Sequence, residues 1–269
     1  NNDAGNCSAV VTYTTPIGTD NCSGSATALT AGLGSGAAFP VGVTTETYEV
    51  TDASNNTASC SFTVTVNDTE GPGITCPAPV VVSNDAGLCG AVVNYTVPTG
   101  TDNCSGATTT QTAGLGSGAT FPIGSTTETY EVTDGSGTSS SCSFSITVLD
   151  NENPEITCPS DIQTSTDTGQ NTAVVTYTAP TGTDNCAGAT TVLQSGLGSG
   201  AAFPIGQKVE TYLVTDAAGH LATCSFTITV TDGEAPSITC PADITVNNDP
   251  GVCAAVVTYT EPVGTDNEA

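Results

Sequence analysis

The sequence almost lacks positive charge. Its 269 residues contain one lysine, Lys208, no arginine and one histidine, His220, against 27 aspartates and glutamates, which gives a formal net charge of −26 at pH 7. A polyanion such as nucleic acid, or an anionic membrane surface, is therefore excluded as an electrostatic partner.

Apolar and aromatic residues are also scarce. Hydrophobic residues make up 37% of the chain and aromatic residues 5%, with no tryptophan and no methionine, so one large core is not expected. No apolar run approaches the roughly 18 residues of a membrane-spanning helix, and we expect no membrane insertion. The twelve cysteines show no CxxC or Cys/His pairing, which indicates disulfides and an extracellular or cell-surface location.

The chain is an internal repeat with a period of 82 residues. The string GLGSGAAFPVG at Gly32–Gly42 returns with small changes at Gly114–Gly124 and Gly196–Gly206, and residues 247–269 repeat the pattern of residues 1–23. Polar linkers such as Asp68–Pro72 separate the repeats. They predict a first module at 1–67 that lacks its first strand, complete modules at 68–149 and 150–231, and the N-terminal part of a fourth at 232–269.

Within each module the apolar residues alternate with a period of two. The runs Ala91–Thr96, Glu128–Thr133 and Ser143–Val148 are rich in Val, Thr and aromatic residues, and turn signals rich in Gly, Asp and Asn separate them. No amphipathic helix is evident. These features predict an all-β fold of tandem immunoglobulin-like β-sandwich modules that form an elongated rod or fibre.

The combined pattern of one module resembles the hyalin repeat (HYR) family. The residues that carry the resemblance are Cys76, Pro77, Cys89, Tyr95, Pro98, Asp102, Asn103, Cys104, Gly118 to Gly124, Tyr130, Asp134, Cys142 and Phe144. The resemblance covers essentially the whole chain. It implies immunoglobulin-related modules from a large extracellular repeat protein and an association with adhesion, not catalysis.

Two cysteine positions of each complete module are expected to pair within it. The first and last strands of such a sandwich start at the same pole and run side by side. The sequence therefore predicts the disulfides Cys76–Cys142 and Cys158–Cys224.

The other two positions are too far apart to pair within one module. About seven strand residues between Cys89 and Cys104 span roughly 20 Å, whereas a disulfide needs Cα atoms within about 7 Å. The repeat also lacks two cysteines, at Asn171 and Glu268, which are 97 residues apart. The same separation joins Cys7 to Cys104 and Cys89 to Cys186, and we hypothesise these two inter-module disulfides.

Local pairing, Cys7–Cys22 and Cys89–Cys104, remains the alternative. It would leave Cys186 and Cys253 without partners. Under the inter-module hypothesis, Cys22, Cys60, Cys240 and Cys253 are expected to find partners outside the 269 residues.

Many carboxylates also recur every 82 residues, mostly in turns and linkers. We expect them to converge at module junctions, where no basic residue is near and Ca²⁺ is the natural counterion. The predicted ligands are Asp68, Glu70, Asp102 and Asp134 at the first junction, facing Asp3, and Asp150, Glu152, Asp184 and Asp216 at the second, with Asp85 the repeat of Asp3. Plain surface acidity is the alternative interpretation.

The sequence favours a structural or adhesive role, as a segment of an extracellular filament, surface stalk or matrix polymer stiffened by disulfides and Ca²⁺. Its expected partners are further copies or modules of the same kind, and glycans or surface proteins. The alternative is a Ca²⁺-assisted glycan- or protein-binding receptor module. An enzyme is not expected, because His220 occurs once and its repeat positions are Asn56 and Thr138.

Overall fold

The structure is a computed structural model that describes residues 1–267. These residues form 17 β-strands and no helix, so among them no helix could cross a membrane. The predicted all-β fold is confirmed. The chain divides into two compact units, one made of Asn1–Asp85 with Cys89–Asp150, the other of Ala86–Leu88 with the residues from Asn151 onward.

Each of the three modules repeats one series of strands. The first contains β1 (Ser8–Val10), β2 (Ala26–Ala31), β3 (Ala38–Pro40), β4 (Gly42–Thr51) and β5 (Thr57–Val66). The second contains β6 (Val80–Ser83), β7 (Gly90–Val92), β8 (Thr108–Ala113), β9 (Thr120–Pro122), β10 (Gly124–Thr133) and β11 (Ser139–Leu149). The third contains β12 (Ile162–Ser165), β13 (Thr172–Val175), β14 (Thr190–Ser195), β15 (Ala201–Pro204), β16 (Gly206–Thr215) and β17 (Leu221–Thr231).

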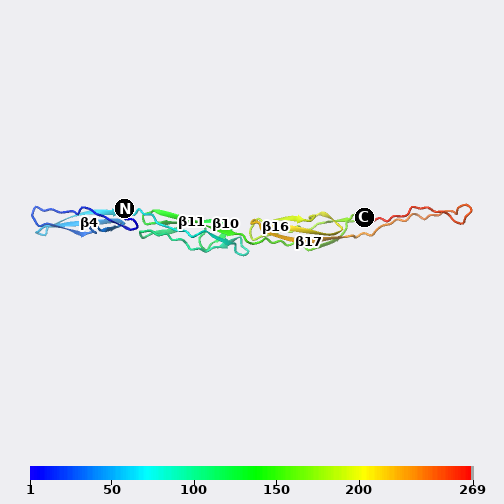
Figure 1. The fold of residues 1–269 in the computed structure, drawn as a ribbon, viewed down its shortest axis with the longest axis horizontal. Helices are drawn as coiled ribbons and strands as arrows, with labels where there is room; N and C mark the ends of the chain where they lie inside the picture. The colour runs from blue at the N-terminus through cyan, green and yellow to red at the C-terminus, as the bar shows by residue number, and fades with distance from the viewer. Residues whose placement is uncertain (268–269) are drawn as a thin grey trace. The chain divides into compact units, whose positions relative to one another are not determined.

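A four-stranded sheet and a two-stranded sheet make up each of the two complete modules. The larger sheets have the orders β6-β11-β10-β8 and β12-β17-β16-β14, and the smaller ones pair β7 with β9 and β13 with β15. Within each long hairpin the two strands are antiparallel neighbours, β10 beside β11 and β16 beside β17 (Figure 1). β6 and β12 join β11 and β17 in parallel. In the first module the larger sheet has three strands, β2-β4-β5.

The core lies between the two sheets of a module, where alternate residues of the hairpin strands point inward. In the second module it is built from Phe121, Tyr130, Phe144 and Ile146, with Phe121 and Ile146 fully buried. The third module repeats this set with Phe203, Tyr212, Phe226 and Ile228. The phenylalanine of each FP pair is completely buried, which explains why this dipeptide recurs every 82 residues.

A disulfide ties the start of each complete module to its longest strand. Cys76 is bonded to Cys142 and Cys158 to Cys224, each with a Cα–Cα distance of 5.6 Å. Both pairs also pack against the hydrophobic clusters of their modules, so each bridge supplements a small core.

Candidate functional site: acidic clefts built on a clamp

The candidate site starts from a tight turn that each module carries before its second strand segment. In the first module the backbone N–H of Asn6 donates to the carbonyl of Asp3, and the Asp3 carboxylate accepts the N–H of Val10 at 2.9 Å. The Asp85 carboxylate accepts the N–H of Val92 in the same way, at 2.8 Å. Asp3 and Asp85 therefore hold their own turns in shape.

At its tip the turn presents a glycine N–H to a glutamate of the following linker. The N–H of Gly5 donates to both carboxylate oxygens of Glu70, at 3.0 and 2.9 Å, and that of Gly87 to both oxygens of Glu152, at 2.9 and 3.0 Å. Gly5 and Gly87 have φ angles of +73° and +71°, which favour glycine at this point of the turn.

A second contact connects the same turn to the loop of the next repeat. The side-chain amide of Asn103 donates to the carbonyl of Asn6 at 3.0 Å, and that of Asn185 to the carbonyl of Leu88 at 2.9 Å. One period later the amide of Asn267 donates to a carbonyl of the equivalent turn at 2.7 Å. This asparagine is the fourth residue of each GTDN motif.

A disulfide reinforces the first of these clamps. Cys7 is bonded to Cys104, with a Cα–Cα distance of 4.8 Å and a sequence separation of 97. Cys89 and Cys186 are each disulfide-bonded as well, and their mutual pairing stays a prediction. Cys22, Cys60, Cys240 and Cys253 are exposed and form no disulfide among the described residues. Residue 268, the second position at which the repeat lacks a cysteine, lies outside the described residues.

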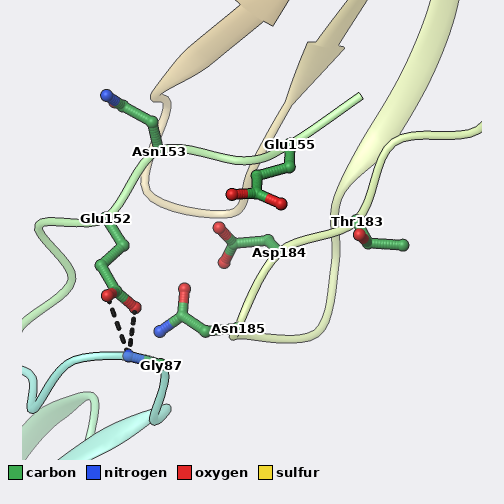
Figure 2. A pocket seen from close by; sticks show the side chains of 7 residues that line it. All are labelled: Gly87, Glu152, Asn153, Glu155, Thr183, Asp184 and Asn185. Atoms are coloured by element: carbon green, nitrogen blue, oxygen red, sulfur yellow. Dashed lines mark hydrogen bonds between the residues drawn. The ribbon is translucent and has the colours of Figure 1, made fainter. Parts of the chain in front are cut away.

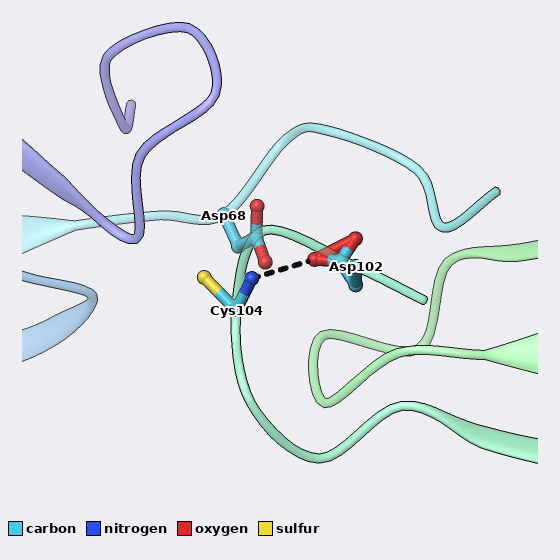
Figure 3. A group of neighbouring side chains, drawn as sticks. All are labelled: Asp68, Asp102 and Cys104. Atoms are coloured by element: carbon cyan, nitrogen blue, oxygen red, sulfur yellow. Dashed lines mark hydrogen bonds between the residues drawn. The ribbon is translucent and has the colours of Figure 1, made fainter. Parts of the chain in front are cut away.

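Two aspartates gather beside the first disulfide. One ligand atom each of Asp68, Asp102 and Cys104 lies within 4.8 Å of the other two. Figure 3 shows these three neighbouring side chains. One oxygen of Asp102 accepts the N–H of Cys104 at 2.9 Å, while the other, Oδ1, is buried and accepts no hydrogen bond. Because the sulfur of Cys104 is in a disulfide, the two carboxylates are the groups that could hold a cation here.

Asp184, the repeat of Asp102, lines an open cleft in the second unit. The cleft has a volume of about 450 Å³ and is bounded by Gly87, Glu152, Asn153, Glu155, Thr183, Asp184 and Asn185. Figure 2 shows the carboxylates of Glu155 and Asp184 and the amide of Asn185 turned into it. The Oδ1 atoms of Asp184 and Asn185 are buried and have no hydrogen-bond partner.

These groups suit a hard divalent cation. Ca²⁺ takes six to eight oxygen ligands from carboxylates, amide oxygens and carbonyls, and a buried oxygen with no donor is costly unless something fills the site. The residues that line the cleft include no lysine, arginine or histidine.

Asp134 and Asp216, two of the predicted calcium ligands, cap turns between strands instead of joining these groups. Asp134 Oδ1 accepts the N–H groups of Ser136 and Thr138 at 2.9 and 2.8 Å. Asp216 Oδ1 accepts the N–H of His220 at 2.8 Å, and its Oδ2 lies 2.9 Å from the ring nitrogen of the same histidine. Asp150 directly follows β11, at the end of the first unit.

Sequence reasoning missed the asparagines and Glu155. Asn103, Asn185 and Asn267 repeat every 82 residues, which could have singled them out, whereas Glu155 occurs in one repeat only. It also missed a buried glutamate in each module, Glu46, Glu128 and Glu210, all fully inaccessible to solvent.

A family model for the HYR domain matches residues 2–66, 67–148 and 149–230. The chain belongs to the HYR domain family. This membership confirms the resemblance inferred from the sequence motifs, and together with the disulfides it places the protein outside the cell. The matched ranges lie close to the predicted modules, whose boundaries stay predictions.

Among curated proteins, hyalin of Strongylocentrotus purpuratus is 38% identical over 98% of this chain and 23% of its own length. Hyalin of Lytechinus variegatus is 36% identical over 99% of this chain and 52% of its own length. This HYR chain therefore spans about a quarter of the first of these two relatives and about half of the second. Of solved structures, protocadherin gammaB7 EC3-6 covers 93% of this chain and 78% of that chain at 16% identity, with a TM-score of only 0.35.

Proposed function

We propose that this HYR protein is a structural and adhesive component of an extracellular repeat polymer and not an enzyme. The observation that carries the proposal is the clamp between successive modules, in which Cys7 is bonded to Cys104 and Glu70 accepts the N–H of Gly5 twice. Such a clamp transmits force along a chain of modules. Its expected partners are further modules of the same kind, or glycans and proteins of the cell surface.

Ca²⁺ at the junctions is the second part of the proposal. Asp68 and Asp102 would hold the ion at the first junction, because their oxygens converge and Asp102 Oδ1 lacks a donor. Glu70 has both oxygens on Gly5 and contributes charge instead of a direct ligand. The bound ion would offset the repulsion between the two aspartates and stiffen the junction.

Thermal unfolding with and without Ca²⁺ tests this proposal. A ligand present at 100 times its dissociation constant stabilises by about 2.7 kcal/mol, so we expect a chelator to lower the unfolding midpoint by roughly 5 °C at low salt. Asp102→Asn should reduce the shift, and the exposed Asp20→Asn, at the equivalent position of the first module, should leave it unchanged. A midpoint that does not respond to Ca²⁺ at any salt concentration would refute the calcium part.

A further inference from the structure

Three successive junctions share one backbone frame, and at the second and third this frame borders a cleft. At each junction, a short two-way backbone pairing fixes the linker against the loop before the GTDN aspartate. These pairings are Gly73 with Thr101, Glu155 with Thr183, and Ser237 with Thr265, each with N···O distances of 2.7 to 2.9 Å.

The part of the frame that all three repeats share also includes two side chains. A glutamate accepts the N–H of the turn glycine, and an asparagine donates to a carbonyl of the turn. Glu70, Glu152 and Glu234 accept the glycine N–H groups, and the asparagines donate 2.7 to 3.0 Å hydrogen bonds. Because these residues are identical in all three repeats, they cannot give the junctions different cation affinities.

The three junctions differ at the linker residue that pairs with the threonine. It is Gly73 in the first, Glu155 in the second and Ser237 in the third. The backbone pairing holds its side chain at the rim, and Figure 2 shows the Glu155 carboxylate directed to the side of Asp184. The cleft at the second junction thus has a third carboxylate, whereas the cleft at the third junction, lined by Glu234, Ser237, Asp266 and Asn267, has a hydroxyl group there.

A second observation in the same cleft points to a ligand. Oδ1 of Asp184 and Oδ1 of Asn185 are both buried without a hydrogen-bond donor. The other oxygen of Asp184 accepts the N–H of Cys186, and the side-chain nitrogen of Asn185 donates to the carbonyl of Leu88. Two oxygens without a donor therefore line the same cleft as the exposed carboxylate of Glu155, and Figure 2 shows all three side chains turned into it.

We infer that the cleft of Glu155, Asp184 and Asn185 is the tightest divalent-cation site of this chain, and that Glu155 sets its affinity. The inference rests on the proposed calcium binding and adds which site binds best and why. Calcium affinity rises with the number of charged oxygen ligands, so the extra carboxylate separates this junction from the other two. Affinity along the chain is therefore graded, and the junctions do not all respond at one calcium concentration.

Calorimetric titration of the 269-residue chain with CaCl₂ tests the inference. Glu155→Ser gives the second junction the residue of the third, and Ser237→Glu does the reverse. We expect Glu155→Ser to weaken the tightest binding class about tenfold and Ser237→Glu to add a second tight site. Glu131→Ser removes the same charge from an outward position of β10 and should leave the titration unchanged.

The outcomes separate the two proposals. Glu155 pairs with Thr183 through its backbone N–H and carbonyl, so the serine variant should keep its fold, which circular dichroism checks. Calcium binding that is as tight in Glu155→Ser as in the parent chain overturns the inference and leaves the proposed function standing. A parent chain that binds no Ca²⁺ overturns both.

Discussion

At the scale of single residues, the buried glutamate of each module determines the shape of the GLGSG segment. Glu128 is fully buried and accepts the N–H groups of Leu115 and Gly116 at 2.8 and 3.0 Å and the hydroxyl of Tyr95 at 2.7 Å. Gly114 lies directly against this carboxylate with a φ of +99°, so a side chain there would meet both a strained backbone and the carboxylate. A charge without a cation is tolerated because donors surround it.

In the first module, hydrogen bonds also shift the titration of the buried Glu46 and of its partner Tyr13. Burial raises the pKa of the Glu46 carboxyl, but donation from the Tyr13 hydroxyl and from the N–H groups of Leu33 and Gly34 outweighs it and leaves the pKa below its ordinary value. Burial, followed by the hydrogen bonds with Tyr48 and Glu46, raises the pKa of Tyr13. The carboxylate stays ionised and the tyrosine neutral at physiological pH.

Glu128→Gln should destabilise the second module strongly. The new amide NH₂ would face N–H donors, so at least one buried donor would lose its acceptor, at a cost of about 3 kcal/mol. Denaturant unfolding followed by circular dichroism measures the loss. Glu131→Gln on the outward side of the same strand is the matched control and should stay within about 0.5 kcal/mol of the parent. Equal stability of the two variants would contradict this role of Glu128.

The sequence contained the signal for this residue. Glu128, Tyr130 and Val132 alternate in β10 and therefore share the inward face, where Tyr130 is 3% exposed. A glutamate on that face was not assigned a role, because its donors come from a loop 12 to 13 residues away. Composition and periodicity do not reveal such tertiary hydrogen bonds.

At the scale of elements, the turns of the long hairpins depend on ionised aspartates. Hydrogen bonds from Asn56 lower the pKa of Asp52. Burial alone would raise the pKa of Asp134 and of Asp216. Hydrogen bonds from Ser136 and Thr138 to Asp134, and from His220 to Asp216, outweigh burial and lower the pKa of both. A carboxyl whose pKa is lowered by folding stabilises the fold above its unfolded value, about 3.9, and loses that contribution as the pH falls through the folded pKa.

The unfolding midpoint should therefore stay level from pH 7 to about pH 5 and fall below about pH 4. General repulsion among the 27 acidic residues acts in the opposite direction, because protonation relieves it. The triple variant Asp52→Asn, Asp134→Asn, Asp216→Asn isolates the turns, and its midpoint should fall less, or rise, between pH 5 and pH 3. Thermal scans in chelator across this range check the result. Parallel profiles for parent and variant would show that the turns do not titrate as expected.

The strands themselves were largely predictable from alternation. The predicted runs 128–133 and 143–148 lie within β10 and β11. The run 91–96 was predicted as one strand, yet β7 ends at Val92. Beyond it the chain pairs with the GLGSG loop, where the N–H of Tyr95 donates to the Ser117 hydroxyl instead of a strand carbonyl. Alternation indicates which face a residue occupies, but not whether a neighbouring backbone continues the ladder.

At the scale of the whole molecule, the repeat explains the two missing cysteines. When one cysteine of a bridge between modules is absent, the other has no partner to bond with. Asn171 and Glu268 are separated by the same 97 residues as the bonded Cys7 and Cys104. The paired absence can therefore be predicted from the 82-residue repeat of the sequence alone. The hydrogen bonds of Glu70 and Asn103 at the same clamp could not be predicted, because they depend on how a turn meets a linker.

Cleavage after acidic residues under non-reducing conditions, with mass spectrometry, distinguishes the possible pairings. The cysteines at 7, 22, 89, 104 and 186 fall in five different limit peptides, 4–20, 21–46, 86–102, 103–128 and 185–210. We expect 4–20 joined to 103–128 and 86–102 joined to 185–210. A peptide joining 86–102 to 103–128 would show pairing within a module and remove the covalent part of the clamp.

The mechanical consequence of the clamp can be measured on the same chain. The variant Cys7→Ser, Cys104→Ser removes one bridge and leaves Cys76–Cys142 and the core of the second module intact. In this variant the side chain of Glu70 is held only by its hydrogen bonds to Gly5, so the linker there should open more often. Because cleavage follows the population of the opened linker, a glutamate-specific protease should cut the Glu70–Gly71 bond about tenfold faster. Cutting at Glu152 serves as the internal reference. An unchanged ratio of the two rates would mean that hydrogen bonds alone hold the first junction closed, and that the disulfide adds resistance to pulling without altering the resting state.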